Sequence, residues 1–232
     1  MSPRTAALLR PLSPSASLTE GAYDRLRADL LSCRLAPGAK LKIADIAAET
    51  GVSSGVIREA LSRLAAEGLV AMEAQKGFRV PPIAAADLRA ITEARIEIEA
   101  SCLRLAIARG DVAWESEILA AYHRLSRVPE RAPDDAKRLS DDYADAHTTF
   151  HAVLVAACDN HWLLKTRDFL FAQSERYRRL SVPMQNPTRD LDAEHRAIMQ
   201  AVLDRRADDA VEATRAHLTA TMTILLVSGL CN

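Results

Sequence analysis

Four of the six histidines are spaced so that their imidazoles could bind one metal ion together. His147 and His151 are four residues apart, so on a helix both rings project from the same face. His195 and His217 fall in two later helical segments. A histidine facing a helical core is costly unless its ring nitrogens are satisfied, and one divalent ion satisfies several at once. Four neutral nitrogens suit Zn²⁺ or Ni²⁺, with water or a ligand oxygen completing the shell.

The spacing of these histidines leaves other interpretations open. A single HxxxH pair on a helix is a weak signal, because such pairs are more often solvated or hydrogen-bonded. A metal-dependent hydrolase or oxidoreductase would also need a general acid or base, and no glutamate stands beside the histidines in an HExxH pattern. We therefore do not predict an enzyme. A metal sensor, in which the ion itself is the signal, is a further alternative.

The histidines lie in a C-terminal region, residues 85–230, in which apolar residues recur at helical spacing and no strand signal appears. Short connections between the helices predict an antiparallel all-α bundle. Two loops are expected at Val128–Pro133 and Ser181–Pro187. The six predicted helices are Asp87–Arg109, a helix capped by Asp111 and ending near Ser126, Asp135–Cys158, His161–Leu180, Thr188–Leu203 and Ala207–Leu230.

Residues 43–80 predict two short helices joined by a tight turn and followed by a β-hairpin. Gly51 stands where the first helix should end, and Ser53 can cap the second helix. The second helix, which ends at Gly68, buries one apolar face. Strands at Leu69–Met72 and Phe78–Val80 complete a winged helix-turn-helix, whose second helix has the size to enter a DNA major groove. The same elements also occur in proteins that never bind DNA.

The chain thus divides into regions of different character. Residues 1–17 predict a disordered arm, and 18–80 form the winged unit, which begins with a helix at Leu18–Leu35. A short strand at Lys40–Lys42 could pair with the hairpin. Pro81-Pro82 stops regular structure, so 81–84 is the predicted linker. The first 80 residues carry 11 basic and 8 acidic side chains, whereas the remainder carries 19 basic and 23 acidic ones. This balance suits contacts with DNA phosphates in the N-terminal region only.

Composition restricts the class of protein. A chain of 232 residues with 49% hydrophobic residues and only 8 glycines suits a helix-rich globular fold. The four cysteines show no paired spacing, so neither a disulfide framework nor a CxxC metal site is indicated. The N-terminus lacks the apolar core of a signal peptide, and no apolar run could span a bilayer. We expect a cytoplasmic protein with no membrane partner.

The segment IAAETGVSSGVIREALSRLAAEGLV resembles the GntR family of bacterial transcription regulators, whose helices typically read LA..LGVSR.PVREAL..L..EGLV before a wing with a glycine. This resemblance runs from about Tyr23 to Val80. It implies a DNA-binding regulator, and we expect a repressor that acts as a homodimer on a palindromic operator.

The chain departs from the family pattern directly after the cap serine. Ser54 stands where an arginine is usual, and Gly55 follows it. The residues expected at the DNA are Ser53, Ser54, Arg58, Arg63, Gln75, Lys76 and Gly77, although Arg63 could equally be a structural surface residue.

The rear half resembles the FCD (FadR-like C-terminal) domain of the same family. That resemblance implies a metal bound by one aspartate and three histidines, with a small organic acid beside it. In this chain His147 replaces the aspartate, so a bound ion would keep its full +2 charge and favour an anionic carboxylate effector. The same change could instead alter or abolish metal binding. The resemblance places effector contacts at Arg95, Glu99 and Asn160, with Arg95 as a second carboxylate partner.

Overall fold

A computed structural model describes residues 17–181 and 189–229. It contains two compact units, of which one ends at Ile83 and the other begins at Ala84. The predicted linker, 81–84, spans this division. The predicted N-terminal arm lies outside the described residues except for Ser17, and most of the predicted loop Ser181–Pro187 lies outside them as well.

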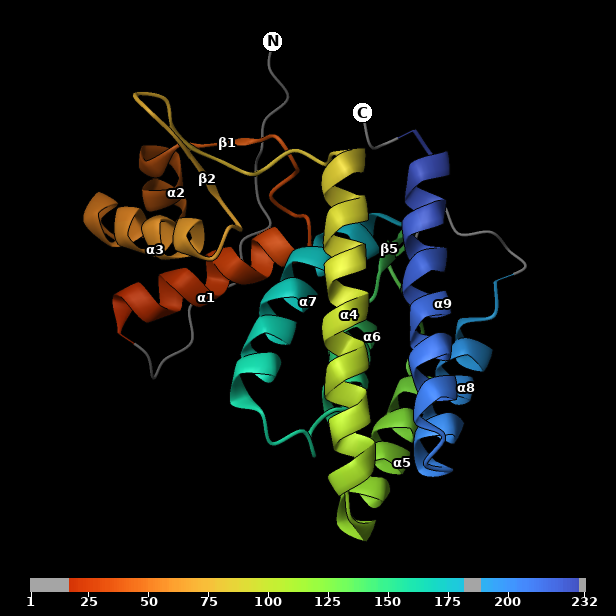
Figure 1. Cartoon of the computed structure of the whole chain (residues 1–232). Coiled ribbons are helices and arrows are strands. Elements are labelled where there is room, and N and C mark those ends of the chain that lie inside the picture. The colour runs from red at the N-terminus through yellow and green to blue at the C-terminus, as the bar shows by residue number, and fades with distance from the viewer. Residues whose placement is uncertain (1–16, 182–188, 230–232) are drawn as a thin grey trace. The chain divides into compact units, whose positions relative to one another are not determined.

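The first unit has the helices and strands of a winged helix-turn-helix. Gly51 has a φ of 72°, the left-handed conformation that ends the helix Ile43–Thr50. The Ser53 hydroxyl accepts from the backbone N–H of Val56 at 3.4 Å and so caps the helix that follows. Both caps are as predicted. The elements, drawn in Figure 1, are α1 (Leu18–Leu31), β1 (Lys40–Leu41), α2 (Ile43–Thr50), α3 (Ser54–Ala66), β2 (Ala71–Glu73) and β3 (Gly77–Arg79).

The three strands form one antiparallel sheet in the order β1-β3-β2. Phe78 pairs with Leu41 on one side and with Met72 on the other, so the short strand after α1 joins the hairpin as expected. Phe78 and its partner Leu41 are buried, whereas Met72, on the edge strand β2, is exposed. One apolar cluster from the helices and the sheet holds the unit together; its fully buried members include Leu26, Leu30, Ile57, Leu61, Leu64 and Val80.

The second unit is a helical bundle, which confirms the predicted mainly α fold class. In Figure 1 the long helices α4 and α9 run side by side, and these two helices contact each other directly. Its helices are α4 (Ala85–Arg109), α5 (Val112–Arg127), α6 (Asp141–Val153), α7 (His161–Ser181), α8 (Leu191–Leu203) and α9 (Ala207–Val227).

One predicted element of this unit is wrong. A single helix was expected over Asp135–Cys158 and no strand in the bundle, yet β4 (Arg131–Ala132) and β5 (Asp135–Leu139) form an antiparallel pair. The helix begins only at Asp141, because the Ser140 hydroxyl accepts from the backbone N–H of Tyr143 at 3.3 Å and caps it. The apolar residues before Ser140 thus belong to a hairpin rather than to a helical face.

The core of the bundle surrounds the histidines. Phe150 is completely buried between His147 and His151 in the sequence of α6, and Ile198 is completely buried one turn after His195 on α8. The apolar packing of α6 and α8 therefore turns their histidine-bearing faces inward. Among the described residues, no helix is long and apolar enough to cross a membrane.

Candidate functional site

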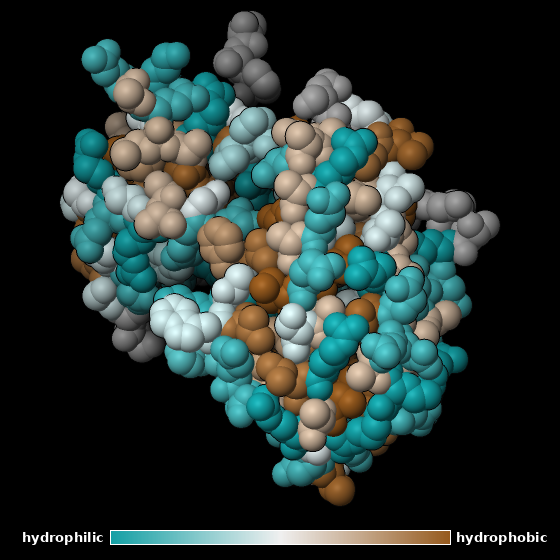
Figure 2. All heavy atoms as spheres, in the orientation of Figure 1, coloured by the Kyte–Doolittle hydropathy of each residue, from teal (hydrophilic) through white to brown (hydrophobic). Residues whose placement is uncertain are grey.

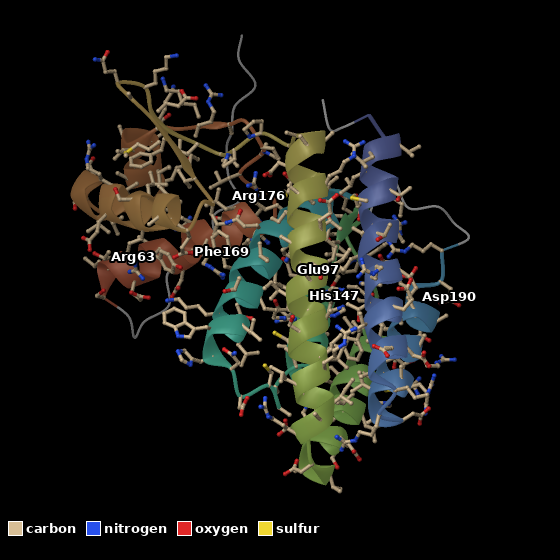
Figure 3. The ribbon with its side chains drawn as sticks, viewed as in Figure 1. Arg63, Glu97, His147, Phe169, Arg176 and Asp190 are labelled. Carbon is tan, nitrogen blue, oxygen red and sulfur yellow. The ribbon has the colours of Figure 1, made fainter. Side chains whose placement is uncertain are left out.

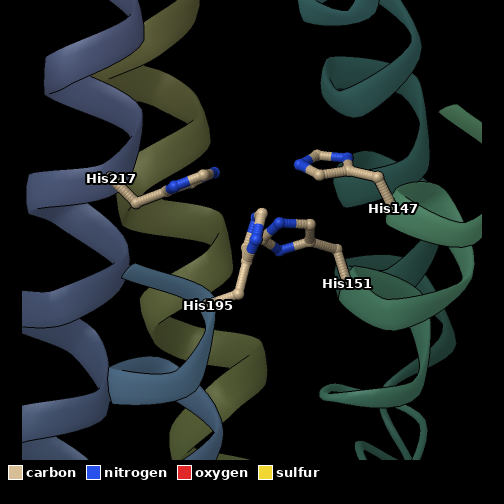
Figure 4. A group of neighbouring side chains, drawn as sticks. All are labelled: His147, His151, His195 and His217. Atoms are coloured by element: carbon tan, nitrogen blue, oxygen red, sulfur yellow. The ribbon is translucent and has the colours of Figure 1, made fainter. Parts of the chain in front are cut away.

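The four predicted histidines meet inside the bundle, as Figure 4 shows. His147 and His151 come from α6, His195 from α8 and His217 from α9. Each offers one nitrogen, and these four atoms all lie within 4.8 Å of one another. All four side chains are buried, with at most 4% of each residue exposed. Residues up to 70 positions apart in the chain thus form one compact nitrogen cage.

The four histidines of this cage have the neutral protonation state that binding of a metal ion requires. Burial lowers the pKa of His147, His151 and His195 well below the usual histidine range, and it also lowers that of His217. The rings are therefore neutral and have lone pairs to donate. His147 Nδ1, His151 Nε2 and His195 Nε2 are buried without a hydrogen-bond partner. Such nitrogens are costly unless something binds them, so the residues present fit a divalent ion with nitrogen ligands.

A carboxylate contacts the fourth histidine. Glu194 Oε2 lies 2.7 Å from His217 Nδ1, and Arg189 donates to both oxygens of Glu194 at 2.8 Å. Burial raises the pKa of Glu194, but the hydrogen bonds from Arg189 and His217 outweigh it and hold the pKa at about 2. Glu194 is consequently ionised and can only accept, so His217 Nδ1 carries the hydrogen of this bond.

The predicted effector residues Arg95 and Glu99 form a second buried polar group. Arg95 Nε lies 3.4 Å from Glu99 Oε1, and Arg95 Nη1 donates to the Ser174 hydroxyl at 2.7 Å. Arg167 joins them through two bonds from Nε to Glu99, at 3.1 and 3.2 Å. Burial lowers the pKa of Arg95 to about 10, against the favourable charge of Glu99. The Glu99 carboxylate thus forms ion pairs with two guanidinium groups.

Phe171 links this group to the histidines. The guanidinium carbons of Arg95 and Arg167 lie 4.4 and 4.8 Å from the centre of its ring. The ring centres of His147 and His151 lie 6.5 and 6.3 Å from the same ring. The arginines therefore contact an aromatic ring that also faces the cage, and their cation–π contacts are desolvated ones.

Asn160, the third predicted effector residue, lies elsewhere. It is exposed just before α7, and its side-chain oxygen accepts from the backbone N–H groups of Trp162 and Leu163 at 3.1 and 3.2 Å. These bonds are those of a helix N-cap. The structure does not bring Asn160 into the buried group of Arg95 and Glu99.

A pocket of about 450 Å³ reaches the cage at His195. Its walls carry acidic side chains together with Arg189 and several apolar groups, so it suits a small polar molecule. The lining residues are Leu125, Ser126, Val128, Glu130, Tyr143, Arg189, Asp190, Leu191, Asp192 and His195.

The residues expected at DNA lie at two places in the first unit. Ser53, Ser54 and Arg58 are exposed at the start of α3, where the Ser53 hydroxyl is already engaged as the cap. Gln75 and Lys76 are exposed in the turn of the β2–β3 hairpin, whose tip is hydrophilic in Figure 2. Gly77 follows with a φ of 87°, which favours glycine.

Arg63 is engaged within its own unit. It donates to Glu20 Oε2 at 2.9 Å, and its guanidinium carbon lies 4.1 Å from the centre of the Tyr23 ring. Figure 3 shows the Arg63 side chain on the side of α3 that faces α1. These contacts favour the structural alternative for Arg63 and separate it from the exposed Arg58.

Three residues of the site were missed in the sequence. Glu194 directly precedes His195, and that adjacency was the one local signal available. Arg189 is five residues before Glu194 and 28 before His217, which it also contacts through the backbone carbonyl at 3.2 Å. Arg167 is 68 residues from Glu99, so no local pattern connects the two.

Comparison with known protein families agrees with both units. The model of the family described as "Bacterial regulatory proteins, gntR family" matches residues 18–80. The model of the FCD domain matches residues 90–220. These two segments contain the predicted DNA-contacting residues and the four histidines, respectively.

The chain is also similar to named regulators along most of its length. It is 37% identical to the HTH-type transcriptional regulator BphR of Paraburkholderia xenovorans, over 95% of this chain and 90% of that protein. It is 35% identical to the HTH-type transcriptional repressor GlaR of Escherichia coli, over 88% and 93%. The repressor RspR of E. coli is 30% identical, over 87% and 85%.

Solved structures share the fold. E. coli McbR/YncC superimposes with a TM-score of 0.75 at 19% identity, covering 92% of this chain and 99% of that one. A GntR regulator from Rhodococcus gives a TM-score of 0.72 at 20% identity, with the same coverage. At these identities the likeness concerns the fold alone.

Proposed function

Because the chain belongs to the GntR family of bacterial regulatory proteins and contains its FCD domain, we propose that it is a repressor controlled by a small carboxylate bound beside a metal. It is a DNA-binding transcriptional regulator, and the family and its relatives are regulators rather than enzymes. GlaR and RspR are both named as repressors, which supports the proposed direction of control. A regulator of this kind acts on the chromosome, in the cytoplasm.

The DNA contacts are assigned to the exposed start of α3 and to the hairpin turn. Arg58 is the cation on the exposed face of α3, so base reading is assigned mainly to it, with Ser53 and Ser54 near phosphates or base edges. Gln75–Gly77 would lie alongside as the wing. Two copies reading the halves of a palindrome would match a two-fold operator, which is why we propose a homodimer.

The single observation that carries the control mechanism is the buried cage of four neutral imidazoles. Zn²⁺ or Ni²⁺ held there would provide an open position with an uncompensated charge for a carboxylate oxygen. The pocket that has His195 and Arg189 among its lining residues is the proposed entry for the carboxylate. The guanidinium of Arg95 already interacts with Glu99 and Ser174, so its assignment as a second carboxylate partner requires an exchange of partners.

Control would follow from linkage between the bundle and operator binding. An effector that binds the protein more tightly in one placement of the winged units than in another shifts the population toward that placement. A difference of about 1–3 kcal/mol in effector binding changes operator affinity by about 5- to 150-fold. The stiff Pro81-Pro82 segment is the proposed connection.

The test is operator binding in three states of the protein. DNA flanking the protein's own gene is titrated with metal-free protein, with Zn²⁺- or Ni²⁺-loaded protein, and with loaded protein plus a panel of carboxylates and their neutral amides. We expect release of DNA by a carboxylate only when metal is present. Release by the metal alone would indicate a metal sensor, and equal effects of acids and amides would refute the anionic effector.

A further inference from the structure

The carboxylate of Glu194 is placed to control one ligand of the metal cage. Its Oε2 lies 2.7 Å from His217 Nδ1. An imidazole has two nitrogens, and when Nδ1 donates to a carboxylate the lone pair is on Nε2. Figure 4 shows the His217 ring directed from α9 toward the other three imidazoles. The hydrogen bond therefore determines which nitrogen of His217 is available to a metal.

Arg189 holds that carboxylate in place. Its Nε and Nη2 each donate to Glu194 at 2.8 Å, and its Nη2 also donates to the backbone carbonyl of His217 at 3.2 Å. Nη1 donates to the Thr221 hydroxyl, one turn further along α9, at 3.2 Å. The Arg189 side chain is 9% exposed. One guanidinium thus connects the start of α8 to the segment of α9 that carries His217.

Glu194 can act on the cage both through its charge and through its hydrogen bond to His217. The four imidazoles are neutral, so negative charge near the ion would come from a neighbouring carboxylate rather than from a ligand. The charge of Glu194 is paired bidentately with Arg189, whose positive charge opposes it at the cage. The directed hydrogen bond to His217 additionally selects the tautomer and the ring angle. A glutamine could keep part of that bond, whereas an alanine could not.

We propose that Glu194 and Arg189 are positioning residues of the metal centre: they present His217 Nε2 to the ion. This inference rests on the metal site of the proposed function and adds to it a carboxylate–histidine–metal relay. Replacement of such supporting partners typically costs about 10- to 100-fold in metal affinity.

A purely structural tether is the competing explanation. Glu194 also joins α8 to α9, so its removal could loosen the bundle without acting on the ring of His217. The two explanations differ in what they change: a tether alters the stability of the metal-free protein, whereas a positioning residue alters the coordination of the bound ion.

The experiment uses full-length, untagged protein and the metal alone. Zn²⁺ affinity is measured by chelator competition, and the coordination of Co²⁺ by its visible absorption spectrum. The variants are Glu194→Ala and Glu194→Gln. The matched control is Glu212→Gln, which removes the same charge from an exposed position of α9. Thermal unfolding of each metal-free variant monitors the fold.

We expect Zn²⁺ affinity to fall about 10- to 100-fold in Glu194→Ala and less in Glu194→Gln, with the control unchanged. The Co²⁺ spectrum should change in Glu194→Ala. Unchanged affinity and spectrum in both Glu194 variants would overturn the inference. If Glu194→Ala does not fold, unchanged affinity and spectrum in Glu194→Gln alone would overturn it. Absence of metal binding by the wild-type chain would instead refute the metal centre of the proposed function.

Discussion

The guanidinium of Arg167 and the carboxylate of Glu99 form a buried ion pair between α7 and α4, with Arg167 Nε 3.1 and 3.2 Å from the two oxygens. Only 2% and 4% of the two side chains are exposed. Arg95 contacts the same carboxylate, so two buried cations depend on one anion. Loss of that anion leaves Arg95 without this ion pair and leaves Arg167 only the exposed carboxylate of Asp168, 3.1 Å from its Nη1.

We therefore expect Glu99→Ala to lower the free energy of unfolding by about 3–5 kcal/mol, since it leaves buried charges uncompensated. Glu97→Ala is the matched control on the same helix, because the Glu97 side chain is 74% exposed and lies 3.6 Å from its partner Arg215. That change should cost at most about 1 kcal/mol. Urea unfolding of the metal-free protein measures both, and equal effects of the two changes would contradict the role of Glu99.

Replacement of the two arginines of α3 should affect different properties, operator affinity for Arg58 and thermal stability for Arg63. Arg58→Ala should weaken operator binding by about 1–3 kcal/mol if Arg58 makes a bidentate base contact, without changing the melting temperature. Arg63→Ala should lose the contacts with Glu20 and Tyr23 and lower the melting temperature slightly, because this pair is partly exposed. Fluorescence anisotropy with operator DNA and thermal unfolding check the pair. Unchanged DNA affinity in Arg58→Ala would remove it from the interface.

Replacing His147 should separate metal binding from effector binding. His147→Asp gives the cage one anionic ligand, so the bound ion and its ligands together have a net charge of +1 instead of +2. We expect this variant to bind Zn²⁺ and to bind carboxylates more weakly than the wild type. His147→Ala, which removes a ligand, should weaken Zn²⁺ binding itself. Calorimetric titration with metal and then with acetate distinguishes these outcomes, and stronger acetate binding by His147→Asp would contradict the charge argument.

The metal-free protein should become less stable as the pH falls below about 6.5. The folded pKa of each caged histidine lies below that of an unfolded histidine, so between these values the unfolded chain binds more protons. Stability is therefore complete above about pH 6.5 and is lost on acidification, by up to about 1.4 kcal/mol per pH unit for each buried ring. His147→Gln should have a shallower dependence. Identical slopes in urea unfolding between pH 7 and 5 would contradict this assignment.

Asn160→Ala tests the role that the structure indicates for this side chain. Loss of the two cap bonds of α7 should lower the free energy of unfolding by about 0.5–2 kcal/mol. Because the residue is exposed, Zn²⁺ and carboxylate affinities should stay as in the wild type, and Asn160→Ser should restore most of the stability. A large loss of carboxylate affinity with unchanged stability would instead support the effector contact implied by the FCD resemblance.

The sequence alone determined the features that depend on neighbours three or four residues away. Ser53 and Gly51 cap and end their helices wherever the unit lies, and the inward faces of α6 and α8 follow from apolar residues one turn apart. The winged unit, the predominance of helices in the rear half and the identity of the four histidines could therefore be predicted. Where local signals competed, at Ser140, the cap and the short hairpin before it prevailed over helical periodicity.

Only the tertiary structure decided what those side chains meet. His147, His195 and His217 come together because α6, α8 and α9 pack around one core, and the spacing of residues within each helix does not specify how helices pair. The same holds for Glu194, Arg189 and His217, and for Arg167 with Glu99. Burial then sets the chemistry, because desolvation keeps the imidazoles neutral and leaves their nitrogens available.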